Sequence, residues 1–108
     1  MRAHEFLDRA SELVKGDRER QHGDKLDNFE NIAAVWEGAI RRIIYMKCRI
    51  HVPQGWLGGE HVGDLMECLK VARRWEGELN DDDAIDAAGY AGCSGEIRSR
   101  KMRGLSDQ

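Results

Sequence analysis

Hydrophobic positions recur every three to four residues along most of the chain, a spacing that is typical of amphipathic helices. Four such segments follow one another, at about Ala3–Lys15, Asp27–Cys48, Glu60–Glu76 and Asp83–Lys101. Val and Ile are scattered rather than gathered in alternating runs, and Pro53 is the only proline. The pattern therefore predicts an all-α fold with four helices. The apolar positions of the first three stripes are Phe6, Leu7, Ala10, Leu13, Val14; Phe29, Ile32, Ala33, Trp36, Ile40, Ile43, Ile44, with Met46 at the edge; and Val62, Leu65, Met66, Leu69, Ala72.

Local signals mark where the helices begin and end. Gly16 lies just past the first helix, where a left-handed C′ residue is expected. Asp27 followed three residues later by Glu30 predicts a capping box at the start of the second helix. Residues 49–59 hold the proline and three glycines and are expected to form a loop. The fourth helix has one face of small residues, which suggests a close approach by another helix or by a ligand: Ala84, Ala87, Ala88, Ala91, Gly92 and Gly95.

Length and composition favour one folded domain. A chain of 108 residues is too short for two cores, and its stability would be marginal and helped by self-association. Hydrophobic residues make up 41% and charged residues 34%, as in a folded helical protein. We expect a four-helix bundle-like single domain over residues 1–97, completed by homo-oligomerisation. Residues 98–108 are basic and poor in apolar side chains, and we expect them to be a frayed tail.

The net charge, the hydropathy and the cysteines argue against several classes of partner and of site. The net charge of −3 argues against binding to extended nucleic acid, which needs a basic surface. No apolar run approaches the roughly 20 residues that cross a bilayer, so no membrane partner is expected. The three cysteines have no metal-binding spacing, and their odd number is unusual for a disulfide framework. We expect reduced thiols in the cytoplasm.

Asp86 is the most informative single residue. On a helical projection it shares a partly apolar face with Tyr90, Cys93 and Ile97. An ionised carboxylate on such a face needs a cation or a basic partner, because burying it alone is costly. The sequence leaves two interpretations open. The partner is either a basic residue of the third helix, at the edge of its apolar stripe, or a metal or nucleotide bound at this face.

The acidic residues follow a pattern that favours the second interpretation. Asp83 and Asp86 are three residues apart, and Asp64 and Glu67 repeat that spacing on the third helix. Two antiparallel helices carrying such pairs could bring four carboxylates to Mg²⁺, which prefers hard oxygen ligands, with Mn²⁺ as a possible substitute. Glu60 and Asp82 are possible additional ligands. Asp64, Glu67 and Glu60 also lie nearly opposite their helix's apolar stripe, where ordinary solvated side chains are expected.

Basic residues supply a second candidate site. The segment GDRERQHGDKLDNF, residues 16–29, gathers basic side chains before a helix N-terminus, an arrangement that suits phosphate. It is equally readable as an ordinary polar connection, and it is not a P-loop. Lys70 and Arg73 can either neutralise Asp86 or bind phosphate. The expected substrate contacts are Arg18, His22, Asn28, Lys70, Arg73 and Tyr90, with Trp36, more simply read as core, as a weak candidate for base stacking.

The order of these motifs resembles a known family. The elements GDR…HGD…NF…IA…W, from Gly16 to Trp36, and LK-x-AR followed by D…D-x-AGYAGC-x-GEI, from Leu69 to Ile97, look like those of small phage and prophage proteins of uncharacterised function. The similarity covers most of the chain. That family is in turn remotely similar to the MazG-type all-α nucleoside triphosphate pyrophosphatases, which carry E-x-x-E, a spacer and E-x-x-D.

The resemblance implies a function and a site. MazG-type enzymes bind Mg²⁺ and hydrolyse a nucleoside triphosphate to its monophosphate and pyrophosphate, as dimers or tetramers. Carried over by position, Asp64 and Glu67 match the first acidic pair and Asp83 and Asp86 the second, with aspartate at two places where glutamate is usual. In the phage proteins that the chain resembles, the positions of Asp82 and Asp86 are usually acidic, whereas those of Asp64 and Glu67 often are not. The sequence thus predicts a Mg²⁺-dependent nucleoside triphosphate pyrophosphohydrolase that forms a homodimer or homotetramer.

A non-catalytic function remains as the alternative. The small-residue face of the fourth helix would also suit a phage accessory protein that binds a protein partner or a nucleotide without turnover. No Ser or Cys lies in a recognisable nucleophile motif, so covalent catalysis has no support.

Overall fold

The structure is a computed structural model, and it describes residues 1–15 and 25–106. Four helices make up nearly all of the described chain: α1 (Ala3–Lys15), α3 (Lys25–Cys48), α4 (Gly59–Arg74) and α5 (Asp81–Ser106). No strand occurs in these two ranges. The all-α prediction is confirmed, and the bounds of α1 are those expected from its hydrophobic period.

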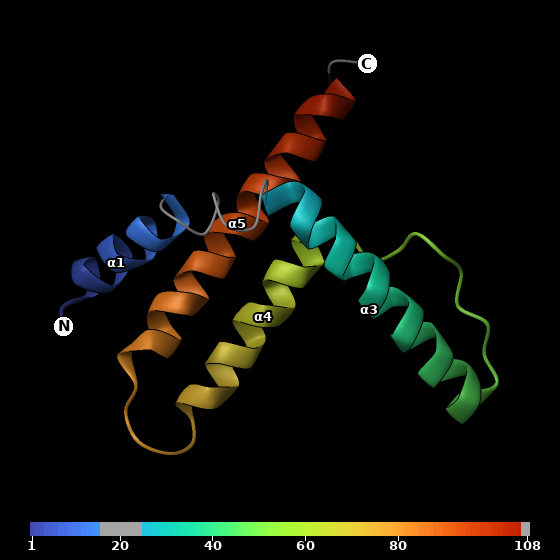
Figure 1. Cartoon of the computed structure of the whole chain (residues 1–108), viewed down its shortest axis with the longest axis horizontal. Coiled ribbons are helices and arrows are strands. Elements are labelled where there is room, and N and C mark those ends of the chain that lie inside the picture. Colours follow the sequence, from blue (N-terminus) through green and yellow to red (C-terminus); the bar gives the residue numbers. More distant parts are fainter. Residues whose placement is uncertain (16–24, 107–108) are drawn as a thin grey trace.

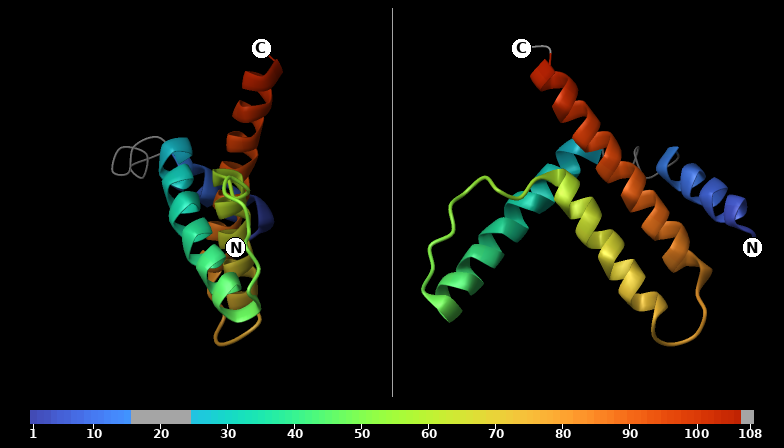
Figure 2. Two further views of the ribbon diagram at one scale, coloured as in Figure 1. Left: turned by 90° about the vertical axis from the view of Figure 1, so that its right-hand side faces the viewer. Right: turned by 180° about the vertical axis from the view of Figure 1, so that it is seen from behind.

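The four helices are arranged around a hairpin. α4 and α5 run antiparallel side by side, joined by the link 75–80, and α1 lies along α5 (Figure 1). α3 crosses the hairpin near the start of α4 with its first turns and then projects away from it, as the views in Figure 2 also show. Among the described elements, α1 packs on α5 alone. The sequence predicts a four-helix bundle-like domain completed by homo-oligomerisation. Within one chain, the four described helices do not close into a bundle (Figure 1).

The core is small and lies where α3 crosses α4 and α5. Phe29 and Ala33 of α3, Val62 of α4 and Ile97 of α5 form its buried cluster. Ile97 and Val62 are the largest fully buried side chains. The expected stripes of α3 and α4 therefore point inward only at the crossing. Six residues predicted to face the interior are exposed, as is Met46 at the edge of the α3 stripe: Leu7, Leu13, Ile43, Leu65, Leu69 and Ala72.

The open arrangement leaves an unusually large surface. The radius of gyration is 16.1 Å, whereas about 13 Å is typical of a compact domain of this length. The accessible surface is 7915 Å², compared with roughly 6,100 Å² for a compact monomer of this mass. The chain thus exposes an amount of surface that folded monomers of its size usually bury.

Several helix ends differ from the sequence prediction by one to five residues. α3 begins at Lys25, so Asp27 lies inside its first turn and the predicted capping box at Asp27 is wrong. α5 begins at Asp81 and continues to Ser106, beyond the end expected near Lys101. Three aspartates in the first turn of α5, residues 81–83, favour its early start because they face the positive end of the helix dipole.

The closest helix contact involves a glycine of α4. A Cβ atom built on Gly63 would lie 2.8 Å from the Cβ of Ser94 and 3.1 Å from the carbonyl oxygen of Tyr90. The sequence placed the close approach on the small residues of the fourth helix. Gly92 and Gly95 of α5 have no described atom within 4 Å of such a Cβ, so the close approach depends on Gly63.

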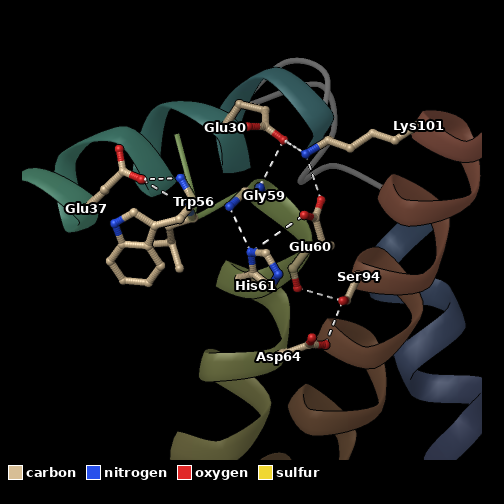
Figure 3. A network of polar contacts seen from close by, with 11 residues as sticks. Glu30, Glu37, Trp56, Gly59, Glu60, His61, Asp64, Ser94 and Lys101 are labelled. Carbon is tan, nitrogen blue, oxygen red and sulfur yellow. Dashed lines mark hydrogen bonds and ion pairs between the residues drawn. The ribbon is translucent and has the colours of Figure 1, made fainter. Parts of the chain in front are cut away.

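The loop 49–58 is fastened to α3 by two side chains. The carboxylate of Glu37 accepts backbone N–H bonds from Gly55, Trp56 and Leu57, at 3.1, 2.7 and 3.0 Å. The Nε of Arg41 donates to the carbonyl of Val52 at 2.7 Å. The bonds to Glu37 hold its pKa below the usual value, with that from Gly55 as the largest cause. Figure 3 shows Glu37 beside Trp56, just before α4 begins.

Candidate functional site

An apolar hollow lies between α1 and α3, over the α4–α5 hairpin. This apolar cleft has a volume of about 410 Å³, within the range of small-molecule sites. Four residues that the sequence predicts as site residues line this cleft. They are Asn28 and Trp36 from α3, and Asp86 and Tyr90 from α5. Its lining comprises Ala10, Leu13, Val14, Lys25, Asn28, Phe29, Ile32, Trp36, Val62, Met66, Ile85, Asp86, Gly89, Tyr90 and Cys93.

Asp86 contributes the carboxylate of this cleft and has a basic partner. Its Oδ2 lies 3.1 Å from the Nζ of Lys70, and both side chains are largely buried. The sequence left open whether a basic residue of α4 or a bound cation compensates this charge. Lys70 does so in the isolated chain, while Asp86 still lines a cleft large enough for a ligand.

A second ion pair between α4 and α5, that of Arg73 with Asp83, lies outside the apolar cleft. The Nε of Arg73 lies 3.6 Å from Oδ1 of Asp83. The carboxylate of Asp83 is buried, whereas Arg73 is more than half exposed. Lys70 and Arg73 therefore pair with two of the four predicted metal ligands, Asp86 and Asp83.

Aromatic and polar groups give the apolar cleft its recognition chemistry. The rings of Phe29 and Tyr90 pack with their centroids 6.4 Å apart, tilted by 37°. Trp36 completes three aromatic side chains on the walls, and Asn28 adds an amide that can both donate and accept. Lys25, at the rim, pairs with Glu96 at 2.7 Å. An apolar pocket with a few convergent polar groups suits a planar aromatic ligand bearing hydrogen-bonding atoms.

The remaining predicted acids of α4 line a different hollow. This polar cleft, of about 630 Å³, is lined by ten residues: Glu60, His61, Asp64, Glu67, Ala91, Ser94, Gly95, Arg98, Lys101 and Met102. The hydroxyl of Ser94 lies 2.6 Å from Oδ1 of Asp64 and 2.7 Å from the carbonyl of Glu60, and it donates its one proton to either acceptor (Figure 3). Ser94 thus joins α5 to α4 beside Gly63.

Lys101 links three helices at the edge of the polar cleft. Its Nζ lies 2.5 Å from Oε1 of Glu30 on α3 and 2.7 Å from Oε2 of Glu60 on α4 (Figure 3). Burial by itself would raise the pKa of Glu60, but the hydrogen bond and charge of Lys101 hold it below the usual value. Burial would likewise lower the pKa of Lys101, and the two glutamates raise it instead.

Sequence reasoning missed Glu30 and Lys101 as partners. The sequence prediction places Lys101 both at the end of the fourth helix and in the frayed tail, and it makes Glu30 part of a helix cap. Lys101 follows the buried Ile97 by four residues and so continues the same helix face. The signal for Lys101 was present in the period of the fourth helix, whereas nothing in the sequence brings Glu30 and Glu60 together.

The fold separates the predicted metal ligands. Asp64 and Glu67 line the polar cleft, Asp86 lines the apolar cleft, and Asp83 pairs with Arg73. Within residues 1–15 and 25–106, no group of three or more His, Cys, Asp or Glu side chains is placed to hold a metal ion. Asp82 is exposed at the start of α5, and Arg18 and His22 lie outside the described residues.

The fold and its clefts define a helical protein with an apolar cleft that is lined by aromatic side chains and by Asp86, whose carboxylate pairs with Lys70. In the described part of the chain, no helix has the length and apolar character needed to cross a membrane. Residues 5–98 match the family described as a domain of unknown function, DUF6378, and the chain belongs to that family.

Two curated relatives are phage proteins. The chain is 35% identical over 87 residues to the Gene 55 protein of Mycobacterium phage L5, covering 81% of this chain and 48% of that protein. It is 28% identical over 99 residues to the Gene 55 protein of Mycobacterium phage D29, covering 92% of this chain and 57% of that protein. The chain thus spans about half the length of the curated relatives it matches. No solved structure matches the chain.

Proposed function

We propose that this protein binds a nucleoside triphosphate in the apolar cleft and hydrolyses it to the monophosphate and pyrophosphate. The observation that carries the proposal is the position of Asp86, a largely buried carboxylate at the wall of a cleft that also holds three aromatic rings and an amide. Charged groups at such a wall are costly to keep, and they are common where a ligand is bound. The MazG-type resemblance of the sequence supports the same reaction.

The residues of the apolar cleft would have separate roles in binding the nucleotide and in its hydrolysis. Trp36, Phe29 and Tyr90 provide aromatic surface against which a base can pack, and Asn28 can hydrogen-bond its edge. Water would add to the α-phosphorus, the bond from that phosphorus to the bridging oxygen would break, and the proton of the water would pass to a carboxylate. Asp86 is the carboxylate we assign, with Lys70 compensating the charge that develops on the phosphates.

Magnesium dependence, with Mn²⁺ as a substitute, is part of the proposal and is supported by the resemblance of the sequence. Within residues 1–15 and 25–106 of one chain, no group of three or more possible ligands is placed to hold it. No step is therefore assigned to the ion here. Arg18 and His22 are proposed as further phosphate contacts from the sequence alone.

Self-association is also part of the proposal. The open arrangement of the helices and the exposed apolar residues of α3 and α4 support a homodimer or homotetramer, since a bundle completed by a second chain would cover them. We place this activity in the cytoplasm of a host cell, on the strength of the phage relatives.

Pyrophosphate release tests the reaction directly. The purified protein is incubated with each NTP and dNTP in the presence of Mg²⁺ or Mn²⁺, and pyrophosphate and monophosphate are measured. We expect release with at least one nucleotide and its loss in Asp86→Asn, a change that keeps the size of the side chain. Asp8→Asn, at an exposed position of α1, is the matched control and should keep the activity. A folded protein that releases no pyrophosphate from any nucleotide contradicts the proposal.

A second function, that of a non-catalytic accessory protein, is favoured by the exposed apolar side chains. Trp75 and Leu79, in the link before α5, are 80% and 96% exposed. Contiguous exposed apolar groups are common where another protein binds. Under this alternative, Asp86→Asn changes stability but no turnover is found, and a nucleotide regulator without turnover would still show thermal stabilisation by nucleotide.

A further inference from the structure

Two ends of the molecule carry opposite charges and exposed apolar side chains. The first, called the basic end, consists of Arg42, Ile43, Met46, Lys47, Arg49 and Ile50, at the end of α3 and just after it. Residues 41–51 contain four Lys or Arg and no acidic residue, although the whole chain has a net charge of −3. Ile43, Met46 and Ile50 are each about half exposed.

The basic end is held in a defined conformation. The guanidinium groups of Arg42 and Arg49 lie 5.8 and 5.3 Å from the centroid of the Tyr45 ring. The ring of His51 packs against the same tyrosine, with centroids 4.6 Å apart. Arg49 has a φ of 57°, so it ends α3 in the left-handed region and turns the chain back toward Tyr45. Cation–π contacts of this kind orient the two arginines at the surface.

The second end, called the acidic turn, joins α4 to α5. It consists of Trp75, Glu76, Glu78, Leu79 and Asp82, all of them exposed. In the described part of the chain, no ion pair involves the acids of this turn, nor Arg42, Lys47 or Arg49 of the basic end. Each end therefore offers charges and apolar groups that the other could satisfy.

The shape of the chain allows both ends to be satisfied at once. In Figure 1 the end of α3 and the α4–α5 turn form the two lower corners of the molecule, on opposite sides. The right-hand view of Figure 2, turned by 180° about the vertical axis, exchanges these corners. In a dimer whose twofold axis is parallel to that vertical axis and lies outside the chain, the basic end of each copy is on the same side as the acidic turn of the other.

We infer that the basic end of α3 is a docking surface for the acidic turn of a second copy of this chain, reciprocally in a symmetric dimer. The inference rests on the self-association proposed above and names the surfaces that make it. The accessible surface of 7915 Å² exceeds that of a compact monomer by roughly 1,800 Å², and a stable interface needs about 800 Å² per partner. Opposite charges at the rim and apolar groups between them are typical of such interfaces.

Charge reversal tests the assignment. One variant, R42E/K47E, makes the basic end acidic, and the other, E76K/E78K, makes the acidic turn basic. Sedimentation velocity over a range of protein and NaCl concentrations should show a dimer for the wild type and a dissociation constant at least about tenfold weaker for each variant alone. An equimolar mixture of the two variants should form a heterodimer, since both contacts of the pair are then attractive again.

Control variants separate this effect from a change in net charge. R2E/R9E changes the net charge by the same amount as R42E/K47E, but at exposed positions at the start of the chain and in α1. It should dimerise as the wild type does. Circular dichroism checks that each variant is folded, and R42Q/K47Q replaces R42E/K47E if the latter is not; it should weaken the dimer in the same direction. A wild-type dimer that both reversals leave unchanged, or variants that do not recover on mixing, overturns the assigned surfaces. A monomeric wild type overturns self-association as well, while leaving the hydrolysis test unaffected.

Discussion

The ammonium group of Lys101 on α5 lies 2.7 Å from Oε2 of Glu60 on α4, and it also contacts Glu30 on α3. One lysine near the end of the chain therefore holds together the three helices that form the core. The charges are partly shielded from water, with Glu60 mostly buried and Lys101 about 39% exposed. Such an arrangement stabilises the crossing of α3 over the hairpin more than a fully exposed pair would.

Removing this charge should weaken the fold. We expect Lys101→Met to lower the free energy of unfolding by about 1–2 kcal/mol, because two glutamates lose their shared partner while the apolar stem of the side chain is kept. Arg103→Met, an exposed position two residues on, should change it by less than about 0.5 kcal/mol. Urea unfolding followed by circular dichroism measures both. Equal effects of the two changes would mean that the triple contact does not stabilise the fold.

The same contact predicts a loss of stability in acid. The pKa of Glu60 is below its ordinary value of 4.5 in the folded chain, so the unfolded chain binds more protons in this range. Its contribution is fully present above about pH 4.5 and is lost as the pH falls through the lower, folded value. Urea midpoints between pH 6 and pH 3 should fall, and more shallowly in Glu60→Gln. Parallel curves for the variant and the wild type would contradict this.

Glu37 should control the loop before α4. Three consecutive N–H groups donate to its carboxylate, so Glu37→Ala removes the acceptor of all three at once. We expect amide hydrogen exchange at residues 55–57 to become at least about tenfold faster, with little change in the middle of α5. Glu12→Ala, at an exposed position of α1, is the control. Exchange that stays slow in Glu37→Ala would show that other contacts hold the loop.

Two glycines should respond in opposite directions to the same substitution. The methyl group of Gly63→Ala would meet the Cβ of Ser94 at 2.8 Å, and we expect it to destabilise the protein by about 1–3 kcal/mol. Gly92→Ala places its methyl group where no described atom lies within 4 Å, and alanine favours the helix by roughly 0.5–1 kcal/mol. Thermal unfolding of both variants distinguishes these outcomes. A destabilised Gly92→Ala would indicate that a further surface packs on that face.

The sequence by itself determined the helices, because the 3.6-residue period and the turn residues act over neighbouring positions. It gave the bounds of α1, the loop before α4, and the need of Asp86 for a compensating charge. Its errors at helix ends are of the same local kind. Asp27, the predicted cap, already lies inside α3, and α5 continues past Lys101 to Ser106.

Only the tertiary structure decided which side chains meet, since that depends on how the helices cross. Asp64 and Asp86 share a sequence pattern, but they line different clefts because they lie on different faces of the α4–α5 hairpin. Glu30 and Glu60 are 30 residues apart and meet at Lys101 because α3 crosses α4 at its first turn. Hydrophobic periodicity specifies that a face is to be covered, whereas the partner that covers it is fixed by packing. The apolar end of α3 stays exposed in the described part of one chain.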